Sequence, residues 1–159
     1  MVTIRYTTGD AAAPPGAGTR IIAHVCNDIG AWGRGFVRAL SERWPEPEAA
    51  YRAWYRDRAG NDFRLGAVQL VPVNEGLWVA NMIGQHGIRR AGGQPPVRYN
   101  AIDEALGALA ECTIQLGASV HMPRIGCGLA GGRWEEIEPL LDKHLCARGI
   151  DVTVYDLPT

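Results

Sequence analysis

Lysine is almost absent from this chain of 159 residues. Lys143 is the single lysine, and the other 15 of the 16 basic residues are arginines. A reaction that needs a lysine nucleophile therefore has one candidate side chain. Acidic residues number 17, so the formal net charge at pH 7 is -1. This near-neutral balance argues against a broad binding surface for duplex nucleic acid or for an anionic membrane, and we expect any phosphate to be bound locally.

Long apolar runs and cysteine motifs are missing as well. No segment approaches the about 20 apolar residues of a membrane span, and no basic segment followed by an apolar signal core opens the chain. We therefore expect a cytoplasmic protein that does not contact a membrane. The four cysteines form no C-x-x-C pair and show no zinc-ligand spacing. The sequence thus predicts reduced thiols, no metal site and no cofactor.

The composition that remains is that of an ordinary globular protein, with 47% hydrophobic and 21% charged residues. At this length we expect one domain that spans residues 1–159. Apolar and β-branched runs predict strands at residues 2–6, 20–26, 66–73, 77–83, 118–122 and 150–155. Helical spacing predicts helices at 36–44, 47–58 and 133–147, and another that ends at Leu116 before Gly117.

The order of these elements predicts the fold class. Residues 20–26 are almost continuously apolar, which is typical of a strand covered on both faces. The short turn at residues 74–76 favours an antiparallel hairpin, and a long loop is expected at residues 84–96. Together the elements predict a three-layer α/β domain with a mixed sheet.

Two glycine-rich segments, residues 27–35 and 123–132, each follow an expected strand and precede an expected helix. At such places backbone N–H groups and a helix N-terminus converge, and glycine lets an anion approach the main chain closely. Two loops of this kind at equivalent strand ends could clasp a diphosphate.

Other phosphate-binding motifs do not fit this sequence. The stretch from Gly33 supplies two glycines of the dinucleotide fingerprint G-x-G-x-x-G, but Arg38 stands where the third glycine belongs. No G-K-[ST] motif occurs. The dehydrogenase and P-loop nucleotidase interpretations are therefore excluded.

These segments resemble those of a macrodomain, the ADP-ribose-binding α/β fold, and in particular the subclass that includes the terminal ADP-ribose protein glycohydrolase. The most specific part is Pro-Arg-Ile-Gly-Cys-Gly-Leu at residues 123–129, and residues 4–10, 23–27, 33–35 and 152–155 extend the resemblance over nearly the whole chain. The resemblance implies a three-layer α/β/α fold with a mixed, mostly parallel central sheet. It also implies ADP-ribose and mono-ADP-ribosylated proteins as partners.

Carried over by position, the resemblance implies a set of ligand-binding residues. Asp10 would accept a hydrogen bond from the adenine amino group, and Tyr155 would pack beside the adenine with help from Leu157. The diphosphate and the distal ribose would be wrapped by Gly126, Cys127, Gly128, Leu129 and Ala130, and the distal ribose would be lined from the other side by Asn27, Gly33 and Gly35. Without the resemblance, a solvated cap at Asp10 and edge packing at Tyr155 explain these residues equally well.

The chain departs from this subclass at both of its catalytic positions. The subclass uses a lysine just after the strand that corresponds to residues 79–83, and this chain has Gly84-Gln85-His86 there. The subclass also uses an aspartate after Gly-Cys-Gly-Leu, where this chain has Ala130. A Schiff-base route is thus excluded unless Lys143 reaches the site, and its place in the last helix argues against that.

Three other residues are catalytic candidates. Gln85 and His86 could orient a water molecule or donate to the leaving carboxylate, and each could instead be a polar loop residue that hydrogen-bonds the backbone. Asp28 could be a general base or a turn former. A thiolate at Cys127 is the weaker alternative, because a phosphate-wrapping position needs only a small side chain.

The leading hypothesis is a macrodomain that binds ADP-ribose and hydrolyses mono-ADP-ribose from acidic side chains of modified proteins. Its route would use neither the lysine nor the aspartate of the subclass. The alternatives are a module that binds ADP-ribose without chemistry, and a phosphatase that acts on ADP-ribose 1''-phosphate.

Overall fold

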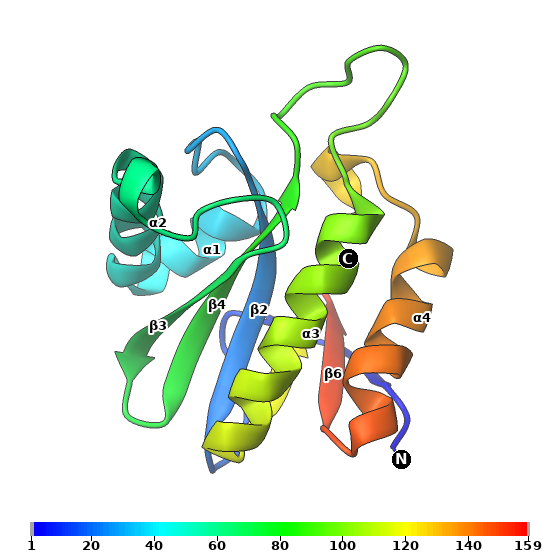
Figure 1. Cartoon of the computed structure of the whole chain (residues 1–159). Coiled ribbons are helices and arrows are strands. Elements are labelled where there is room, and N and C mark those ends of the chain that lie inside the picture. The colour runs from blue at the N-terminus through cyan, green and yellow to red at the C-terminus, as the bar shows by residue number, and fades with distance from the viewer. Residues whose placement is uncertain (1, 159) are drawn as a thin grey trace.

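Within residues 2–158, which the computed structural model describes, six strands form one sheet with helices on both faces (Figure 1). The strands are β1 (Arg5–Thr8), β2 (Arg20–Asn27), β3 (Val68–Asn74), β4 (Leu77–Gln85), β5 (Ser119–Met122) and β6 (Val152–Asp156). The α-helices are α1 (Phe36–Arg43), α2 (Glu46–Arg56), α3 (Tyr99–Leu116) and α4 (Trp134–His144). Short 3-10 helices span Arg58–Gly60, Gly128–Ala130 and Cys146–Arg148.

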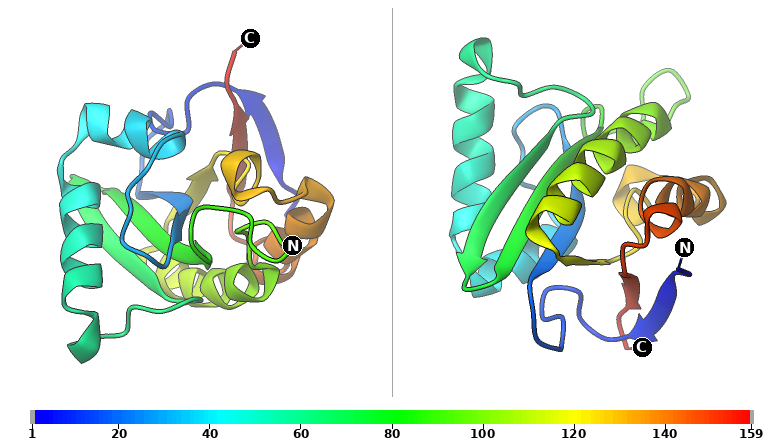
Figure 2. Two further views of the ribbon diagram at one scale, coloured as in Figure 1. Left: turned by 90° about the horizontal axis from the view of Figure 1, so that it is seen from above. Right: turned by 60° about the horizontal axis from the view of Figure 1, so that its bottom comes forward.

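The sheet is mixed and mostly parallel, as predicted. The strand order is β1-β6-β5-β2-β4-β3, and β3 and β4 form the antiparallel pair. The hairpin turn between them contains Gly76. Figure 2 shows β1 and β6 side by side at one edge of the sheet and the β3–β4 hairpin at the other.

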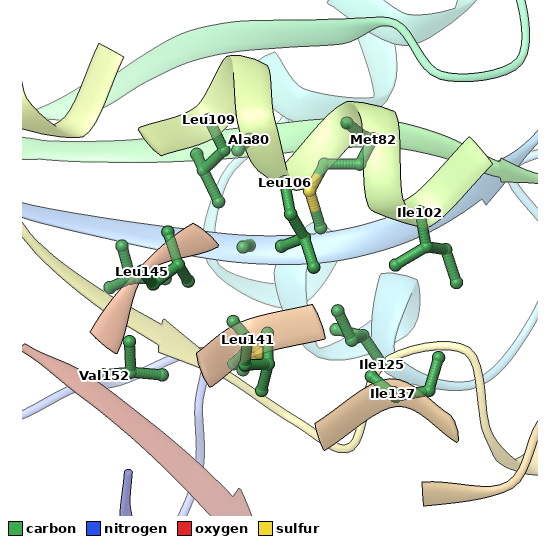
Figure 3. Packing of buried hydrophobic residues seen from close by; sticks show 14 of the residues in the cluster. Ala80, Met82, Ile102, Leu106, Leu109, Ile125, Ile137, Leu141, Leu145 and Val152 are labelled. Carbon is green, nitrogen blue, oxygen red and sulfur yellow. The ribbon is translucent and has the colours of Figure 1, made fainter. Parts of the chain in front are cut away.

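The three-layer arrangement is also confirmed. Helices α1 and α2 pack on one face of the sheet, and α3 and α4 pack on the opposite face (Figures 1 and 2). Strand β2 is buried between the layers, with Ile21 and Ala23 in one apolar cluster and Ile22 and Cys26 in the other. Figure 3 shows the cluster between the sheet and the α3–α4 layer, where Leu106 and Leu141 pack over the strands.

Several element boundaries differ from the sequence predictions. The first strand lies at Arg5–Thr8 instead of residues 2–6, because pairing with β6 defines this edge strand and begins opposite Thr153. The last helix ends at His144, before the 3-10 turn at Cys146–Arg148, and not at residue 147. The helix α3 ends at Leu116, as predicted, and Gly117 follows it in a left-handed conformation.

The correction that matters most for the site concerns β4. Residues 84 and 85 were expected in a loop, but β4 continues to Gln85 because β2 continues beside it to Asn27, which pairs with Gln85. Gln85 also forms an isolated antiparallel bridge with Val97. The side chain of Gln85 is therefore positioned by the sheet.

No helix in residues 2–158 is both long enough and apolar enough to cross a membrane.

Candidate functional site

The candidate site lies where the neighbouring parallel strands β2 and β5 end. Loop 27–35 leads from β2 to α1, and loop 123–132 leads from β5 to α4. A cavity of about 320 Å³ lies between the two loops, and a second cavity of about 180 Å³ lies beside it. We call these the larger and the smaller cavity, and together the cleft. Ligands of open α/β sheets bind at such strand ends.

The first glycine loop brings the start of α1 into the cleft. Gly35 has a positive φ of 87° and directly precedes the helix, and Gly35, Phe36 and Val37 all line the larger cavity. Helix α1 has no side-chain cap and no acidic residue in its first turn. Its N-terminal N–H groups and partial positive charge therefore face a space that Arg34 also lines, which favours an anion there.

The second glycine loop forms the opposite wall. All five residues from Gly126 to Ala130 line the larger cavity, so the structure brings these expected binding residues together with Gly35. The N–H of Gly132 donates to the carbonyl of Gly126 at 2.8 Å, and the N–H of Val97 donates to the carbonyl of Ala130 at 3.0 Å. These bonds hold the loop in a fixed shape.

Leu129 connects the two cavities. Its side chain is exposed and lines both, and its Cδ1 lies 3.8 Å from the point where a Cβ on Gly35 would stand. The other residues that line both cavities are Val25, Arg34, Val37 and Gln85.

Asn27 and Gly33 line the smaller cavity. The Asn27 side chain is buried, and its Oδ1 accepts hydrogen bonds from the N–H groups of Ile29 (3.1 Å) and Ala31 (3.2 Å) and from the hydroxyl of Tyr51 (2.8 Å). Its Nδ2 donates to the carbonyl of Ala31. The amide of Asn27 is therefore engaged in shaping the loop.

Asp28, Gln85 and His86 come together where the neighbouring strands β2 and β4 end. Oδ2 of Asp28 lies 2.7 Å from Nδ1 of His86, and Oδ1 of Asp28 accepts a hydrogen bond from the N–H of Gly87 at 2.8 Å. Nε2 of Gln85 donates to the carbonyl of Gly87 at 3.0 Å. Gln85 lines both cavities, whereas Asp28 and His86 line neither and directly follow the lining residues Asn27 and Gln85 in the sequence.

The packing around Gly84 disfavours a side chain at the position of the missing lysine. A Cβ on Gly84 would lie 2.7 Å from Cγ1 of Ile102, which requires Ile102 to shift, and 3.1 Å from Cγ1 of Val25, which is a tight contact. Ala130 lines the larger cavity at the position of the missing aspartate. Lys143 lies on α4, where its Nζ is 3.2 Å from Oδ1 of Asp103 on α3, away from the cleft.

Three expected adenine-binding residues lie outside the lining of both cavities. Oδ1 of Asp10 accepts the N–H of Ala12 at 2.9 Å, and Oδ2 lies 3.5 Å from Nη2 of Arg43. Tyr155 is buried next to Gly9, and its hydroxyl is 2.7 Å from Nδ1 of His121. Leu157 is exposed after the end of β6.

Cys127 is not activated as a nucleophile. Burial raises the pKa of its thiol, and this effect exceeds the opposing effect of nearby Arg124. The thiol therefore stays protonated at neutral pH, in agreement with a small lining residue. No group of three His, Cys, Asp or Glu side chains that could hold a metal ion occurs in residues 2–158.

Three basic residues that line the larger cavity, His24, Arg34 and Arg124, were not among the residues expected from the sequence. His24 lines the larger cavity although it lies within a buried strand. Arg124 also lines it, held by a two-pronged pair with Asp156 (2.8 and 3.0 Å). The sequence did contain a signal for His24, because it is a polar residue in an apolar strand that leads into a glycine loop.

Several solved structures have a similar fold, and two of those described here are macrodomains. A macrodomain protein from Streptomyces coelicolor is 61% identical, covering 96% of this chain and 98% of that chain, with a TM-score of 0.87. A protein of unknown function from Bacteroides thetaiotaomicron is 55% identical, covering 98% and 99%, with a TM-score of 0.95. The macrodomain of Mycobacterium tuberculosis DarG is 25% identical over the full length of both chains, with a TM-score of 0.80.

Among curated proteins, Chromodomain-helicase-DNA-binding protein 1-like of Danio rerio is 36% identical over 96% of this chain, which spans only 15% of that protein. An ADP-ribose 1''-phosphate phosphatase of Meyerozyma guilliermondii is 26% identical, covering 91% of this chain and 95% of that protein. ADP-ribose glycohydrolase OARD1 of Homo sapiens is 33% identical over 70 residues, which are 43% of this chain and 45% of that protein. No family model matches the chain.

Proposed function

Because this chain belongs to the macrodomain family, we propose that it binds ADP-ribose and hydrolyses mono-ADP-ribose from the acidic side chains of modified proteins. The observation that carries the proposal is the larger cavity, which is lined by both glycine loops and by the start of α1. Backbone N–H groups and a helix N-terminus are the groups that bind a diphosphate without a metal ion. Arg34 adds a positive charge at the same place.

In our proposal the ligand lies along this cleft. In the proposed complex, the loop from Gly126 to Ala130 wraps the diphosphate and the distal ribose. Asn27, Gly33 and Gly35 line the distal ribose from the other side. Asp10, Tyr155 and Leu157 hold the adenine beyond the cavities, with the carboxylate of Asp10 accepting from the exocyclic amine.

Hydrolysis of the proposed substrate needs little catalytic machinery. The bond that breaks joins C1'' of the distal ribose to the carboxylate oxygen of an Asp or Glu side chain, and the bond that forms joins C1'' to the oxygen of water. The carboxylate leaves as a stable anion, and the proton of the water passes to a base. A positioned water and a charged, water-poor cleft supply much of the rate for such a reaction.

Gln85 and the Asp28–His86 pair are the proposed catalytic groups. The amide of Gln85 stands at the boundary of the two cavities and would orient the attacking water. The Asp28 carboxylate faces Nδ1 of His86, so a neutral imidazole carries its proton there and presents the lone pair of Nε2 as a base. The side chain of His86 is exposed, and in the proposed reaction its Nε2 takes the proton of the attacking water.

The named relatives support a hydrolase, since they include an ADP-ribose glycohydrolase and an ADP-ribose 1''-phosphate phosphatase. Because one of these relatives is named a phosphatase, hydrolysis of ADP-ribose 1''-phosphate is the second candidate function. Gly84 and Ala130 stand where the subclass has catalytic side chains. Their presence supports a module that binds ADP-ribose but catalyses no reaction.

One assay separates these functions. Purified protein is incubated with a target mono-ADP-ribosylated on glutamate, and in parallel with ADP-ribose 1''-phosphate, while loss of label and release of phosphate are followed. We expect loss of label without release of phosphate. Release of phosphate alone would support the phosphatase, and binding of ADP-ribose with neither release would support the non-catalytic module.

A further inference from the structure

A row of three polar side chains crosses the sheet and ends at the larger cavity. His24 on β2, Asn81 on β4 and Gln69 on β3 stand directly opposite one another in the strand registers. His24 and Asn81 are only 2% and 0% exposed, and His24 lines the cavity. Buried polar groups in an apolar layer are stabilised only when their hydrogen bonds are made, so the direction of each bond in this row is informative.

The bonds of the row run in one direction. Nε2 of Gln69 donates to the carbonyl of Ala50 on α2 at 3.0 Å, which leaves Oε1 of Gln69 as an acceptor. Nδ2 of Asn81 donates to that Oε1 at 3.0 Å and to the carbonyl of Pro47 at 3.2 Å. Both amide protons of Asn81 are thus used, and its Oδ1 faces Nε2 of His24 at 2.5 Å.

This arrangement fixes the tautomer of His24. Because Oδ1 of Asn81 can only accept, Nε2 of His24 must carry the proton. Burial lowers the pKa of His24 to about 4, against a smaller opposite effect of the bond with Asn81, so the imidazole is neutral at physiological pH. Nδ1 therefore has no proton and presents a lone pair. Sγ of Cys26 is a weak neighbour of both ring nitrogens, 3.9 Å from Nδ1 and 3.7 Å from Nε2.

The ring of His24 is also held in place by its aromatic neighbours. Trp32 packs against it edge to face at 5.5 Å, and Phe36 packs at 5.9 Å between ring centroids. The imidazole therefore has a fixed position, and His24 lines the same cavity as Gly35 and residues 126–130.

We propose that His24 is a specificity-determining residue that accepts a hydrogen bond from a hydroxyl group of the distal ribose. The inference rests on the proposed binding of ADP-ribose. A lone pair repels a phosphate oxygen and attracts a hydroxyl donor, so this point of the cavity selects the sugar and not the diphosphate. Gly35 and the loop from Gly126 to Ala130, which contact the distal ribose in the proposed complex, line the same cavity as His24, whereas Asn27 and Gly33 line the smaller cavity.

Calorimetry with two ligands tests this inference. ADP-ribose carries the distal ribose, whereas ADP keeps the adenosine and the diphosphate but lacks that sugar. His24→Phe keeps a ring between Trp32 and Phe36 and removes the acceptor. We expect the affinity for ADP-ribose to fall about tenfold, the effect of one lost hydrogen bond, and the affinity for ADP to stay unchanged. An equal loss for both ligands, or no loss for either, overturns the inference.

A measurement on the wild-type protein keeps the test valid if His24→Phe does not fold. In protein labelled with ¹⁵N-histidine, NMR shows which ring nitrogen of His24 carries the proton, with the signal assigned by its loss in His24→Gln. We expect the Nε2-protonated form, and a shift of the Nδ1 signal on addition of ADP-ribose but not of ADP. A proton on Nδ1, or equal shifts with both ligands, overturns the inference. Wild-type protein that does not bind ADP-ribose at all overturns the proposed function and this inference with it.

Discussion

The carboxylate of Asp28 faces the imidazole of His86, with Oδ2 of Asp28 2.7 Å from Nδ1 of His86. The two residues belong to loops that follow the neighbouring strands β2 and β4, 58 positions apart in the sequence. The second oxygen of Asp28 accepts from the N–H of Gly87, so the carboxylate holds the backbone as well as the ring. Two residues that the sequence offered as separate candidates thus form one oriented pair.

The first prediction concerns this pair. We expect His86→Ala to lower turnover of glutamate-linked mono-ADP-ribose about 100-fold, the effect of a lost general base, with little change in ADP-ribose affinity. Arg90→Ala, an exposed change in the same loop, is the control and should leave both quantities unchanged. Full activity of His86→Ala under single-turnover conditions would contradict a catalytic role for the pair.

Gln85 gives a second prediction. Gln85→Ala removes the amide that lines both cavities and should reduce turnover while ADP-ribose affinity, measured by calorimetry, stays near normal. A rise in the dissociation constant with unchanged turnover would instead make Gln85 a binding residue. Full activity in both Gln85→Ala and His86→Ala would direct the search to Asn27, Asp28 and the backbone groups of the loops.

The space around Gly84 gives a prediction on stability. Gly84→Ala places a methyl group 2.7 Å from Cγ1 of Ile102 and should lower the free energy of unfolding by about 1–3 kcal/mol, the usual cost of overpacking. The matched control is Gly60→Ala, because the Cβ of an alanine there would meet no atom within 4 Å. Urea denaturation measures the free energy of unfolding of the two variants. Equal values for Gly84→Ala and Gly60→Ala would show that the core can accommodate a side chain at position 84.

Gly128 provides a prediction on binding. Gly128→Glu should abolish ADP-ribose binding, because a carboxylate in the second glycine loop would repel the diphosphate. Gly128 has a φ of +65°, so any side chain there strains the backbone, and Gly128→Ala is the control that carries this strain without the charge. Unchanged affinity in a folded Gly128→Glu protein, measured by calorimetry, would remove this loop from the ligand site.

Two buried histidines predict how stability depends on pH. Burial lowers the pKa of both His24 and His121 from 6.5 to about 4, and for His121 the positive charges of Arg20 and Arg5 add to the effect. Between pH 6.5 and 4 the unfolded chain binds protons at these positions and the folded protein does not, so stability must fall as the pH falls through this window. For His24 the loss amounts to about 2 kcal/mol between pH 7 and pH 5.

The comparison of wild type with His24→Phe isolates this contribution. Urea denaturation at pH 7 and at pH 5 should give a smaller loss of stability for the variant than for the wild type. An identical loss in both proteins would show that His24 does not stay neutral in the folded state.

The sequence predicted the fold well because its signals are local. The apolar run at residues 20–26 indicated a strand covered on both faces, and β2 contributes side chains to both apolar clusters. The turn at residues 74–76 indicated the antiparallel hairpin, and Gly117 indicated the end of α3. The glycine loops were recognised for the same reason, since a strand, a run of glycines and a helix follow one another in the chain.

Features that depend on contacts between strands could not be predicted from the sequence. The extension of β4 to Gln85 follows from its pairing with Asn27 on β2, and the row of His24, Asn81 and Gln69 exists only because three strand registers align. The sequence offered Asn27 as a ribose contact, but only the folded loop shows its amide bonded to Ile29, Ala31 and Tyr51. Likewise, the contact between Asp28 and His86 needs the two neighbouring strands to end together.

The most direct test of the account compares linkages on the modified protein. Targets mono-ADP-ribosylated on glutamate or aspartate, and targets modified on serine or arginine, are incubated with the wild-type protein and with Gly128→Glu, and the loss of label is followed. The account predicts that the wild type removes the label from the acidic linkages only, and that Gly128→Glu removes none. Retention of the label on the acidic linkages by a wild-type protein that binds ADP-ribose tightly would contradict it.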